Sequence, residues 1–340
     1  MSINAKELAG ILNLSEAAVS MALHNKPGVS SITRRKVLET ARENGYDFSR
    51  IKEEEPLSVS NGQIFFLIYR KHGAIVTDTP FFSQLSEGID AGCKKSHFHL
   101  NVYYLYEDQG IEAQLESIIR IGCRGIILLG TEMKEEDFVP FRHLSIPLVM
   151  LDNYIEAIDT DCVLINNIQG ACHAVNYLIS RVKSQPGYLR SSYPINNFSE
   201  RADGFYKALR QNGMSTSSAI VHQLAPSMEG AYADMLSLLN HGEKTAHCYF
   251  ADNDLIAAGA MRAFREKGWR IPEDLSIIGF DNMPLSSYIE PALTTVHVPK
   301  QYMGEMAVLR LAHAIENKNE KKSCVKIEIS TTLIRRGTVR

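Results

Sequence analysis

The feature that most constrains this chain's fold is a regular alternation of strand-like and helix-like segments after residue 62. Short apolar runs bounded by turn residues are typical of buried parallel strands, and the intervening segments carry apolar residues at helical spacing. The predicted strands are Ile64–Tyr69, His99–Leu105, Gly125–Leu129, Leu148–Leu151, Val163–Ile165, Ala246–Phe250 and Leu275–Gly279. The predicted helices are 82–96, 110–121, 168–181, 200–212, 228–240 and 255–267. Such alternation predicts an α/β fold, with parallel sheets covered by helices on both faces.

Length adds a second constraint. A chain of 340 residues exceeds what one hydrophobic core usually fills, and the alternating part alone is long enough for two lobes side by side. Ligands of open parallel sheets bind beyond the carboxyl ends of the strands. A crevice between the two lobes is therefore the natural binding site.

Residues 1–46 follow a different, all-helical pattern. Asn4, Ser15 and Ser30 are each placed to cap a short helix. The residues expected to face inward are Leu8, Ile11 and Leu12 on the first helix, Val19 and Leu23 on the second, and Val37, Leu38 and Ala41 on the third. Two short helices joined by a tight turn and supported by a third form a helix-turn-helix unit. Residues 47–61, with Glu53, Glu54 and Glu55 before a proline and a small polar cluster, predict an acidic linker, or else a charged loop inside one domain.

Charge is unevenly distributed along the chain. The net charge is −3, but residues 1–50 hold seven Lys/Arg against five Asp/Glu, so the remainder carries −5. The second helix presents Glu16, Ala17, Ser20 and Met21 where a recognition helix meets base edges. Phosphate contacts are expected from the start of the third helix, at Thr33, Arg34, Arg35 and Lys36. Any three-helix bundle can have such caps. This segment alone is therefore compatible with a DNA-binding unit and with a helical bundle that does not bind DNA.

Catalytic and metal-binding signals are missing from the sequence. It contains no G-x-G-x-x-G, G-x-x-x-x-G-K-[ST], H-E-x-x-H or G-x-S-x-G pattern, and the six cysteines never form a C-x-x-C pair. No run approaches the roughly 18 apolar residues of a membrane helix, and the N-terminus lacks the features of a secretory signal. We therefore expect a cytoplasmic protein without cofactor or metal, and not an enzyme.

A series of motifs follows in order along nearly the whole chain. The helix-turn-helix segment runs from Leu14 to Val37. The later motifs are Pro80-Phe81-Phe82, Gly125–Leu128, Ile146–Asp152, Glu200–Phe205, Ala251–Asp254 with Ala257 and Gly259, Ile271–Asp281 and Pro291–Val296. Together they resemble the LacI/GalR family of bacterial transcription regulators. The resemblance implies a headpiece fused to a two-lobed domain like that of periplasmic binding proteins. It implies lobes comprising 62–163 with 294–324, and 164–293 with 325–340.

The resemblance also implies roles for individual residues. DNA contacts and supports would come from Asn4, Ser15, Glu16, Ala17, Ser20, Met21, His24, Ser30, Thr33 and Arg34. Effector contacts would come from Phe81, Phe82, Asp152, Asn197, Arg201, Asn253 and Asp281. Aromatic faces, carboxylates, amides and a guanidinium suit a polyhydroxylated ligand. The structural alternatives are turn or helix capping for Asp281 and Asp254 and a buried inter-strand ion pair for Arg201.

The expected function is that of a sequence-specific regulator, most simply a repressor of a carbohydrate-utilisation operon. It would bind a pseudopalindromic operator as a homodimer and respond to a small molecule, a sugar first and a purine-like corepressor second. A solute-binding receptor of the same two-lobed fold is the alternative from another class. One departure stands out: Glu55 lies where relatives carry the hinge leucine that wedges into the minor groove. Since a carboxylate is repelled by phosphates and cannot unstack a base step, we expect little bending of the operator.

Overall fold

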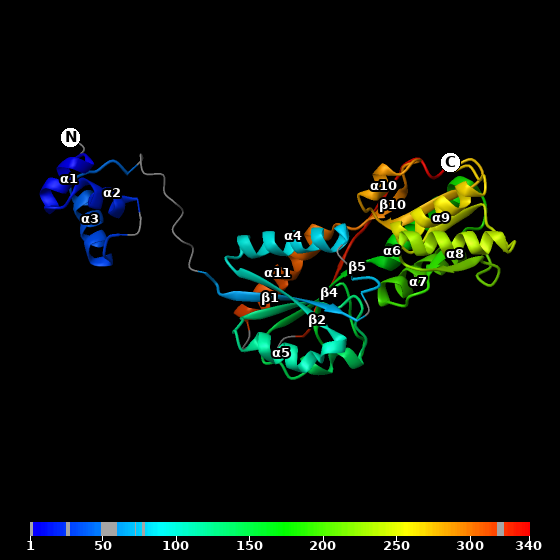
Figure 1. The fold of residues 1–340 in the computed structure, drawn as a ribbon, viewed down its shortest axis with the longest axis horizontal. Helices are drawn as coiled ribbons and strands as arrows, with labels where there is room; N and C mark the ends of the chain where they lie inside the picture. Colours follow the sequence, from blue (N-terminus) through cyan, green and yellow to red (C-terminus); the bar gives the residue numbers. More distant parts are fainter. Residues whose placement is uncertain (1–2, 25–27, 49–59, 72, 77–78, 318–322) are drawn as a thin grey trace. The chain divides into compact units, whose positions relative to one another are not determined.

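The computed structural model describes residues 3–24, 28–48, 60–71, 73–76, 79–317 and 323–340, which are drawn in colour in Figure 1. The chain divides into two compact units, residues 1–60 and 61–340. The acidic segment Glu53–Glu55 lies outside the described residues, so the predictions about the linker are not tested.

The first unit is a bundle of three helices, α1 (Ala5–Leu12), α2 (Glu16–Leu23) and α3 (Ser31–Glu43). All three predicted caps are confirmed. Asn4 and Glu7 form a reciprocal capping box, with both hydrogen bonds at 2.9 Å. The hydroxyl oxygens of Ser15 and Ser30 each accept a backbone N–H at 3.1 Å. Each cap satisfies N–H groups that the helix itself leaves without partners, a stabilisation of roughly 1 kcal/mol per cap.

The core of this bundle is formed by the predicted apolar positions, with one exception. Leu8, Val19 and Val37 are fully buried, and Ala41 joins them. The prediction for Ile11 is wrong, because its side chain is 55% exposed. Leu8 and Leu12, one turn apart, already fill the inward stripe of an eight-residue helix, and Ile11 falls beside that stripe.

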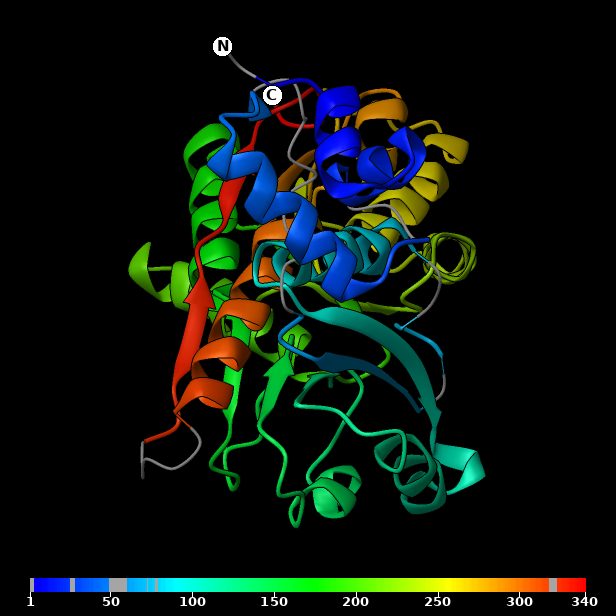
Figure 2. The ribbon, with the colours of Figure 1, turned by 90° about the vertical axis from the view of Figure 1, so that its left-hand side faces the viewer.

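In the second unit, the first lobe is built on a six-stranded parallel sheet. The strands are β1 (Gln63–Arg70), β2 (His99–Tyr106), β3 (Gly125–Leu129), β4 (Leu148–Leu151), β5 (Asp161–Ile165) and β11 (Lys326–Ile329). Their order is β11-β5-β4-β3-β1-β2, so β11 and β2 form the two edges (Figure 2, with β11 in red). The associated helices are α4 (Pro80–Lys95), α5 (Ile111–Ile119), α11 (Lys300–Glu316) and the 3₁₀ segments η2 (Glu107–Gln109) and η3 (Glu136–Phe141).

Both faces of this sheet are covered, as β1 illustrates. Its even-numbered residues Ile64, Phe66 and Ile68 pack in one cluster with α4 and α11. Its odd-numbered residues Phe65 and Leu67 pack in another cluster with α5 and η3. Successive side chains of a strand point to opposite faces, so a strand buried on both sides needs an unbroken apolar run. That requirement explains the sequence IFFLIY in β1.

The second lobe contains a six-stranded sheet of order β12-β10-β9-β8-β6-β7, in which only β12 runs antiparallel to its neighbour. The strands are β6 (Gly187–Ser191), β7 (Val221–Leu224), β8 (Cys248–Ala251), β9 (Ser276–Asp281), β10 (Thr294–His297) and β12 (Thr332–Ile334). Helices α6 (Asn167–Val182) and α7 (Asn196–Gln211) pack on one face, and α8 (Met228–Asn240) and α9 (Asp254–Glu266) on the other. A short helix, α10 (Leu285–Tyr288), follows β9.

Close helix packing explains two glycines, Gly204 and Gly259, of the motifs that resemble the LacI/GalR family. A Cβ on Gly204 of α7 would lie 2.5 Å from the carbonyl oxygen of Ile168 in α6. A Cβ on Gly259 of α9 would lie 2.3 Å from the carbonyl oxygen of Met228 in α8. Both distances are far below van der Waals contact, so any larger residue at either position would push two helices apart.

Three of the predicted lobe boundaries are wrong. β10 was expected in the first lobe but pairs with β9 in the second, and β11 was expected in the second lobe but pairs with β5 in the first. The boundary at 163/164 would also cut β5, which lies wholly in the first sheet. The chain therefore crosses between lobes after β5, after β10 and after β11. Within the described residues, no helix is long and apolar enough to cross a membrane.

Candidate functional site

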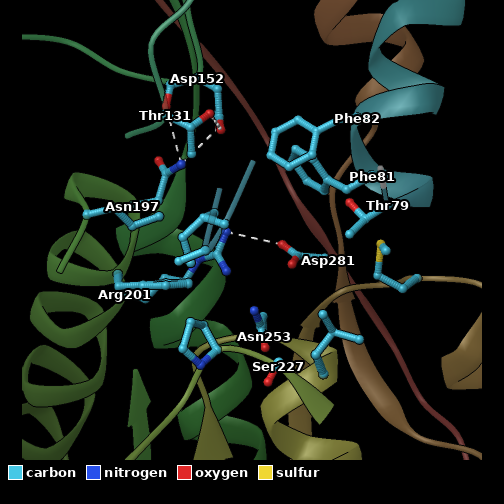
Figure 3. A pocket seen from close by; sticks show the side chains of 17 residues that line it. Thr79, Phe81, Phe82, Thr131, Asp152, Asn197, Arg201, Ser227, Asn253 and Asp281 are labelled. Carbon is cyan, nitrogen blue, oxygen red and sulfur yellow. Dashed lines mark hydrogen bonds and ion pairs between the residues drawn. The ribbon is translucent and has the colours of Figure 1, made fainter. Parts of the chain in front are cut away.

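A cavity lies between the two lobes, near the carboxyl ends of strands from both sheets. Its walls come from both lobes and are largely apolar, with polar groups at a few points (Figure 3). The lining residues from the first lobe are Ala74, Ile75, Thr79, Phe81, Phe82, Thr131 and Asp152. Those from the second lobe are Ile195, Asn197, Phe198, Arg201, Pro226, Ser227, Asn253, Leu255, Asp281 and Met283.

Phe81 and Phe82 provide the aromatic wall of the first lobe. They occupy the first turn of α4, which Pro80 opens, since proline is favoured at the first helical position. The two rings meet edge to face, with centroids 5.1 Å apart and planes at 72°. Across the cavity, the ring of Phe198 lines the wall of the second lobe. A flat apolar ligand face can pack between these aromatic surfaces.

Two carboxylates mark the strand ends of the two lobes, Asp152 directly after β4 and Asp281 as the last residue of β9. Both have left-handed backbone conformations, with φ of 64° and 102°. These conformations are costly for residues with a Cβ and are concentrated at functional sites. The turn after each strand therefore aims a carboxylate into the cavity at the expense of backbone strain.

Asp152 connects the two lobes. Its carboxylate accepts hydrogen bonds from Thr131 Oγ1 of the first lobe at 2.7 Å and from Asn197 Nδ2 of the second lobe at 3.0 Å (Figure 3). Burial raises the pKa of Asp152 to about 6, against the opposing effects of these hydrogen bonds and of the Arg201 charge. Beside it, Asn153 Oδ1 accepts from Asn196 Nδ2 at 2.7 Å, which adds a second bond between the lobes.

Arg201 is the most extensively bonded side chain of the site and is only 3% exposed. Its Nε donates to Asn167 Oδ1 at 2.9 Å, its Nη1 to the Asp252 carbonyl at 2.5 Å, and its Nη2 to Asp281 Oδ1 at 3.1 Å. The guanidinium also lies 3.8 Å from the centroid of the Phe280 ring. Arg201 thus forms a buried ion pair, as the alternative role predicted, but the pair joins a helix to a strand end rather than two strands, and it lies in the cavity wall.

The remaining polar groups are helix caps that also face the cavity. Asn253 Oδ1 accepts the Ile256 N–H at the start of α9, and Ser227 Oγ accepts the Gly230 N–H at the start of α8. Capping uses the oxygen of each side chain as an acceptor. The Asn253 amide group and the Ser227 hydroxyl still carry hydrogen atoms that can be donated to a ligand.

All seven residues predicted for the effector site line this one cavity. Sequence reasoning missed Thr131, Phe198 and Ser227 among the lining residues. A signal existed for two of them: Ser227 precedes a predicted helix as a cap, and Phe198 lies one turn before Arg201. Asp254, foreseen as a cap, is instead fully buried and accepts hydrogen bonds from Thr295 Oγ1 and the Met283 N–H. No cluster of three or more His, Cys, Asp or Glu side chains suited to a metal occurs among the described residues.

The buried carboxyl group of Asp254 should make the free energy of unfolding depend on pH. Burial, then the Asp281 charge, raises its pKa to about 8, whereas an unfolded chain titrates it near 4. Between these values the folded state holds a proton that the unfolded state lacks, so the free energy of unfolding falls as pH rises. Between pH 6 and 8 this carboxyl should account for a loss of about 2 kcal/mol. Urea unfolding of wild type and Asp254→Asn checks this, because the variant should lose less stability over the range; equal losses would contradict the prediction.

The predicted DNA-contacting residues are accessible in the first unit. Glu16, Ala17 and Ser20 are exposed along α2, and Met21 is half-buried against Gly28. His24 ends α2, and its ring Nδ1 lies 2.9 Å from the Ser20 carbonyl oxygen. Ser30 and Thr33 hydrogen bond through their hydroxyls at 2.8 Å at the start of α3. The polar face of α2 is thus open to a partner.

Comparison with known proteins adds independent information. Residues 175–339 match the family described as periplasmic binding protein-like domain. The HTH-type transcriptional repressor PurR of Mannheimia succiniciproducens is 26% identical over 98% of this chain and 98% of its own. Among solved structures, a transcriptional regulator CelR–cellobiose complex has a TM-score of 0.71, with 21% identity over 99% of each chain, a likeness of fold. A LacI family transcriptional regulator from Enterococcus faecium with bound ribose has a TM-score of 0.68, with 27% identity over 81% of this chain and 98% of that one.

Proposed function

We propose that this chain is a transcription regulator of the LacI/GalR type, a sequence-specific DNA-binding repressor controlled by a small molecule in the cleft. The observation that carries the proposal is the joint presence of a capped helix-turn-helix unit and of a two-lobed cavity lined by all seven predicted residues. Such a protein is a regulator rather than an enzyme, and it acts on DNA in the cytoplasm.

The cavity favours a neutral, polyhydroxylated effector, most simply a sugar. Arg201, the one cation among the lining residues that the structure describes, is already paired with Asp281, so an anionic ligand would find no unpaired positive charge in the cavity wall. A hydroxyl both donates and accepts, so neighbouring hydroxyls can bond to the Asp281 carboxylate and the Arg201 guanidinium together. The apolar face of a pyranose or furanose ring would then pack on Phe81 and Phe82. A purine is the second candidate, because the same aromatic wall can stack on a base.

Control of DNA binding follows from linkage. Hydrogen bonds donated by Asn197 to Asp152 and by Asn196 to Asn153 join the lobes beside the cavity, so ligand contacts to both lobes bias their relative orientation. In a homodimer, lobe orientation would control the spacing of two helix-turn-helix units on a pseudopalindromic operator. Sedimentation should accordingly give twice the 38.0 kDa mass of the chain. The direction of control, induction or corepression, is set by which lobe orientation the effector prefers.

A ligand screen identifies the effector class. We expect thermal unfolding of the full chain to shift upward with one of D-ribose, cellobiose, hypoxanthine or guanine. A ligand at about 100 times its Kd adds about 2.7 kcal/mol of stability, which corresponds to a shift of about 5 °C. Phe82→Ala should lower the affinity for that ligand by about tenfold through the lost ring contact. A shift that Phe82→Ala leaves unchanged would place the ligand outside this cleft.

A DNA experiment separates the regulator from a solute-binding receptor of the same fold. Selection of genomic fragments by the full chain, followed by mobility shift, should enrich pseudopalindromic sites. A receptor would bind the sugar with no specific DNA fragment retained. Enrichment of fragments without a shared sequence would also contradict the proposal.

A further inference from the structure

Lys300 occupies a position that ordinary stability does not explain. It is the first residue of α11, directly after the crossover that leads from β10 in the second lobe to the first lobe. Its side chain is 2% exposed. Burying an ammonium group is costly, and the N-terminus of a helix carries positive partial charge that disfavours a cation. A cation that is both buried and placed at a helix N-terminus is unfavourable for two reasons, and a compensating role is therefore expected.

The contacts of Lys300 reach both walls of the cleft. Its Nζ donates to the backbone carbonyl of Asp281 in the second lobe at 2.5 Å and to that of Val298 in the crossover at 3.2 Å. The same Nζ lies 5.5 Å from the centroid of the Phe81 ring in the first lobe. An ammonium over an aromatic face is attracted to it, most strongly where water is excluded. One cation thus touches the strained turn at Asp281, the crossover and the aromatic wall.

The charged groups around Lys300 come from four elements of the second lobe. The acidic groups that face it are Asp281 from β9 and Asp254 from α9, and the basic groups are Arg201 from α7 and His297 from β10. Asp281 itself faces Arg201, Lys300, Asp254 and Asp152. Burial raises the pKa of Asp281, and the charges of Arg201 and Lys300 oppose that rise. Without Lys300, a single guanidinium would have to keep this carboxylate ionised among two other buried acids.

We propose that Lys300 is a positioning residue of the ligand cleft. Its buried ammonium holds the Asp281 turn of the second lobe against the Phe81 wall of the first and keeps the Asp281 carboxylate ionised as a ligand acceptor. The ligand part of this inference rests on the proposed function, in which Asp281 accepts a hydroxyl of the effector. Lys300 itself does not line the cavity.

The first experiment needs no effector. The full chain is labelled with ¹³C at the aspartate carboxyl carbons, and the Asp281 signal is assigned by its loss in Asp281→Asn. Lys300→Met should move the Asp281 titration midpoint upward by about one pH unit or more, as expected when a neighbouring cation is removed. Lys300→Gln, which keeps an N–H for the Asp281 carbonyl, should shift it similarly and serves if the methionine variant does not fold. Lys267→Met, on an exposed lysine, is the matched control and should shift nothing. An unchanged midpoint in both Lys300 variants would overturn the proposal.

The second experiment uses calorimetric titration with D-ribose from pH 5.5 to 8.5. Lys300→Met should weaken binding most at the acid end, because the higher pKa of Asp281 expected in this variant increases the protonated fraction there. Lys300→Arg should keep the wild-type pH profile even if its affinity is lower. A purely structural role would lower affinity equally at every pH, and that result would contradict the proposal. If wild type does not bind D-ribose, this sugar fails as effector while the carboxyl titration still decides the role of Lys300.

Discussion

Replacing Arg201 by methionine should raise the Kd for the effector by at least thirtyfold. The guanidinium bonds to Asn167, the Asp252 carbonyl and Asp281 at once, and no other cation lines the cavity among the described residues. Removing one partner of a buried, hydrogen-bonded charge pair costs about 2–5 kcal/mol, much of it from the charge left behind. Asp281 would be that charge. Its pKa, already above the ordinary value because of burial, would rise further without Arg201.

A matched variant separates lost contacts from a general effect of charge. Arg210→Met removes an arginine from the same helix at an exposed position, and it should leave both affinity and stability unchanged. Affinity is measured by calorimetric titration of the ligand found in the screen, and stability by urea unfolding. Near-normal binding by Arg201→Met would mean that the ion pair with Asp281 is only structural and that the ligand is recognised elsewhere.

Replacing Ala17 by glutamate should reduce operator affinity by about a hundredfold or more. Ala17 lies in the first turn of α2 and is exposed, so the substitution leaves the bundle core intact, and glutamate is a good helix former near a helix N-terminus. On DNA, the same carboxylate would enter the groove beside the phosphates, without a counter-charge and with a longer side chain than the groove floor accommodates. Fluorescence anisotropy with the selected operator measures the loss, and the far-ultraviolet circular dichroism spectrum should not change.

Gly10→Glu is the control for added negative charge in the same unit. Gly10 is exposed on α1, and a Cβ there meets no atom within 4 Å. This variant should weaken operator binding only slightly, because one added negative charge reduces the non-specific attraction to DNA phosphates. The salt dependence of binding should change by a correspondingly small amount. Equal losses for both variants would mean that α2 has no special role in reading the operator.

Much of the fold was predictable because the deciding signals are local. The caps Asn4, Ser15 and Ser30 act within one helical turn, and the predicted helix 228–240 coincides with α8. The strand positions of β10 and β11 were not predictable in this way. Each is four residues long, and its lobe is decided by pairing with β9 or with β5, the latter more than 150 residues away in the chain. Periodicity within a segment contains no information about its partner.

The residues of the candidate site also divide into those that local motifs predict and those that only tertiary contacts reveal. Asp152, Arg201 and Asp281 could be placed because they belong to motifs at strand ends or on one helix. Lys300 could not, since its significance depends on burial at a crossover whose neighbours come from four other elements, β9, α4, α9 and α7. The polar residues of strand β6 likewise depend on contacts outside the strand. Ser191 can be buried because its N–H donates to the Asp252 carboxylate and its hydroxyl donates to the Tyr193 carbonyl. No sequence pattern predicts these hydrogen bonds.

The central claim is that ligand binding in the cleft and operator binding by the helix-turn-helix unit are coupled in one molecule. The most direct measurement is the Kd of the effector, titrated by calorimetry with and without saturating operator DNA. Linkage requires the operator to change effector affinity by the same factor as the effector changes operator affinity, typically 5- to 150-fold. We expect two factors that agree within error and differ from one. Identical effector affinity with and without operator would contradict it.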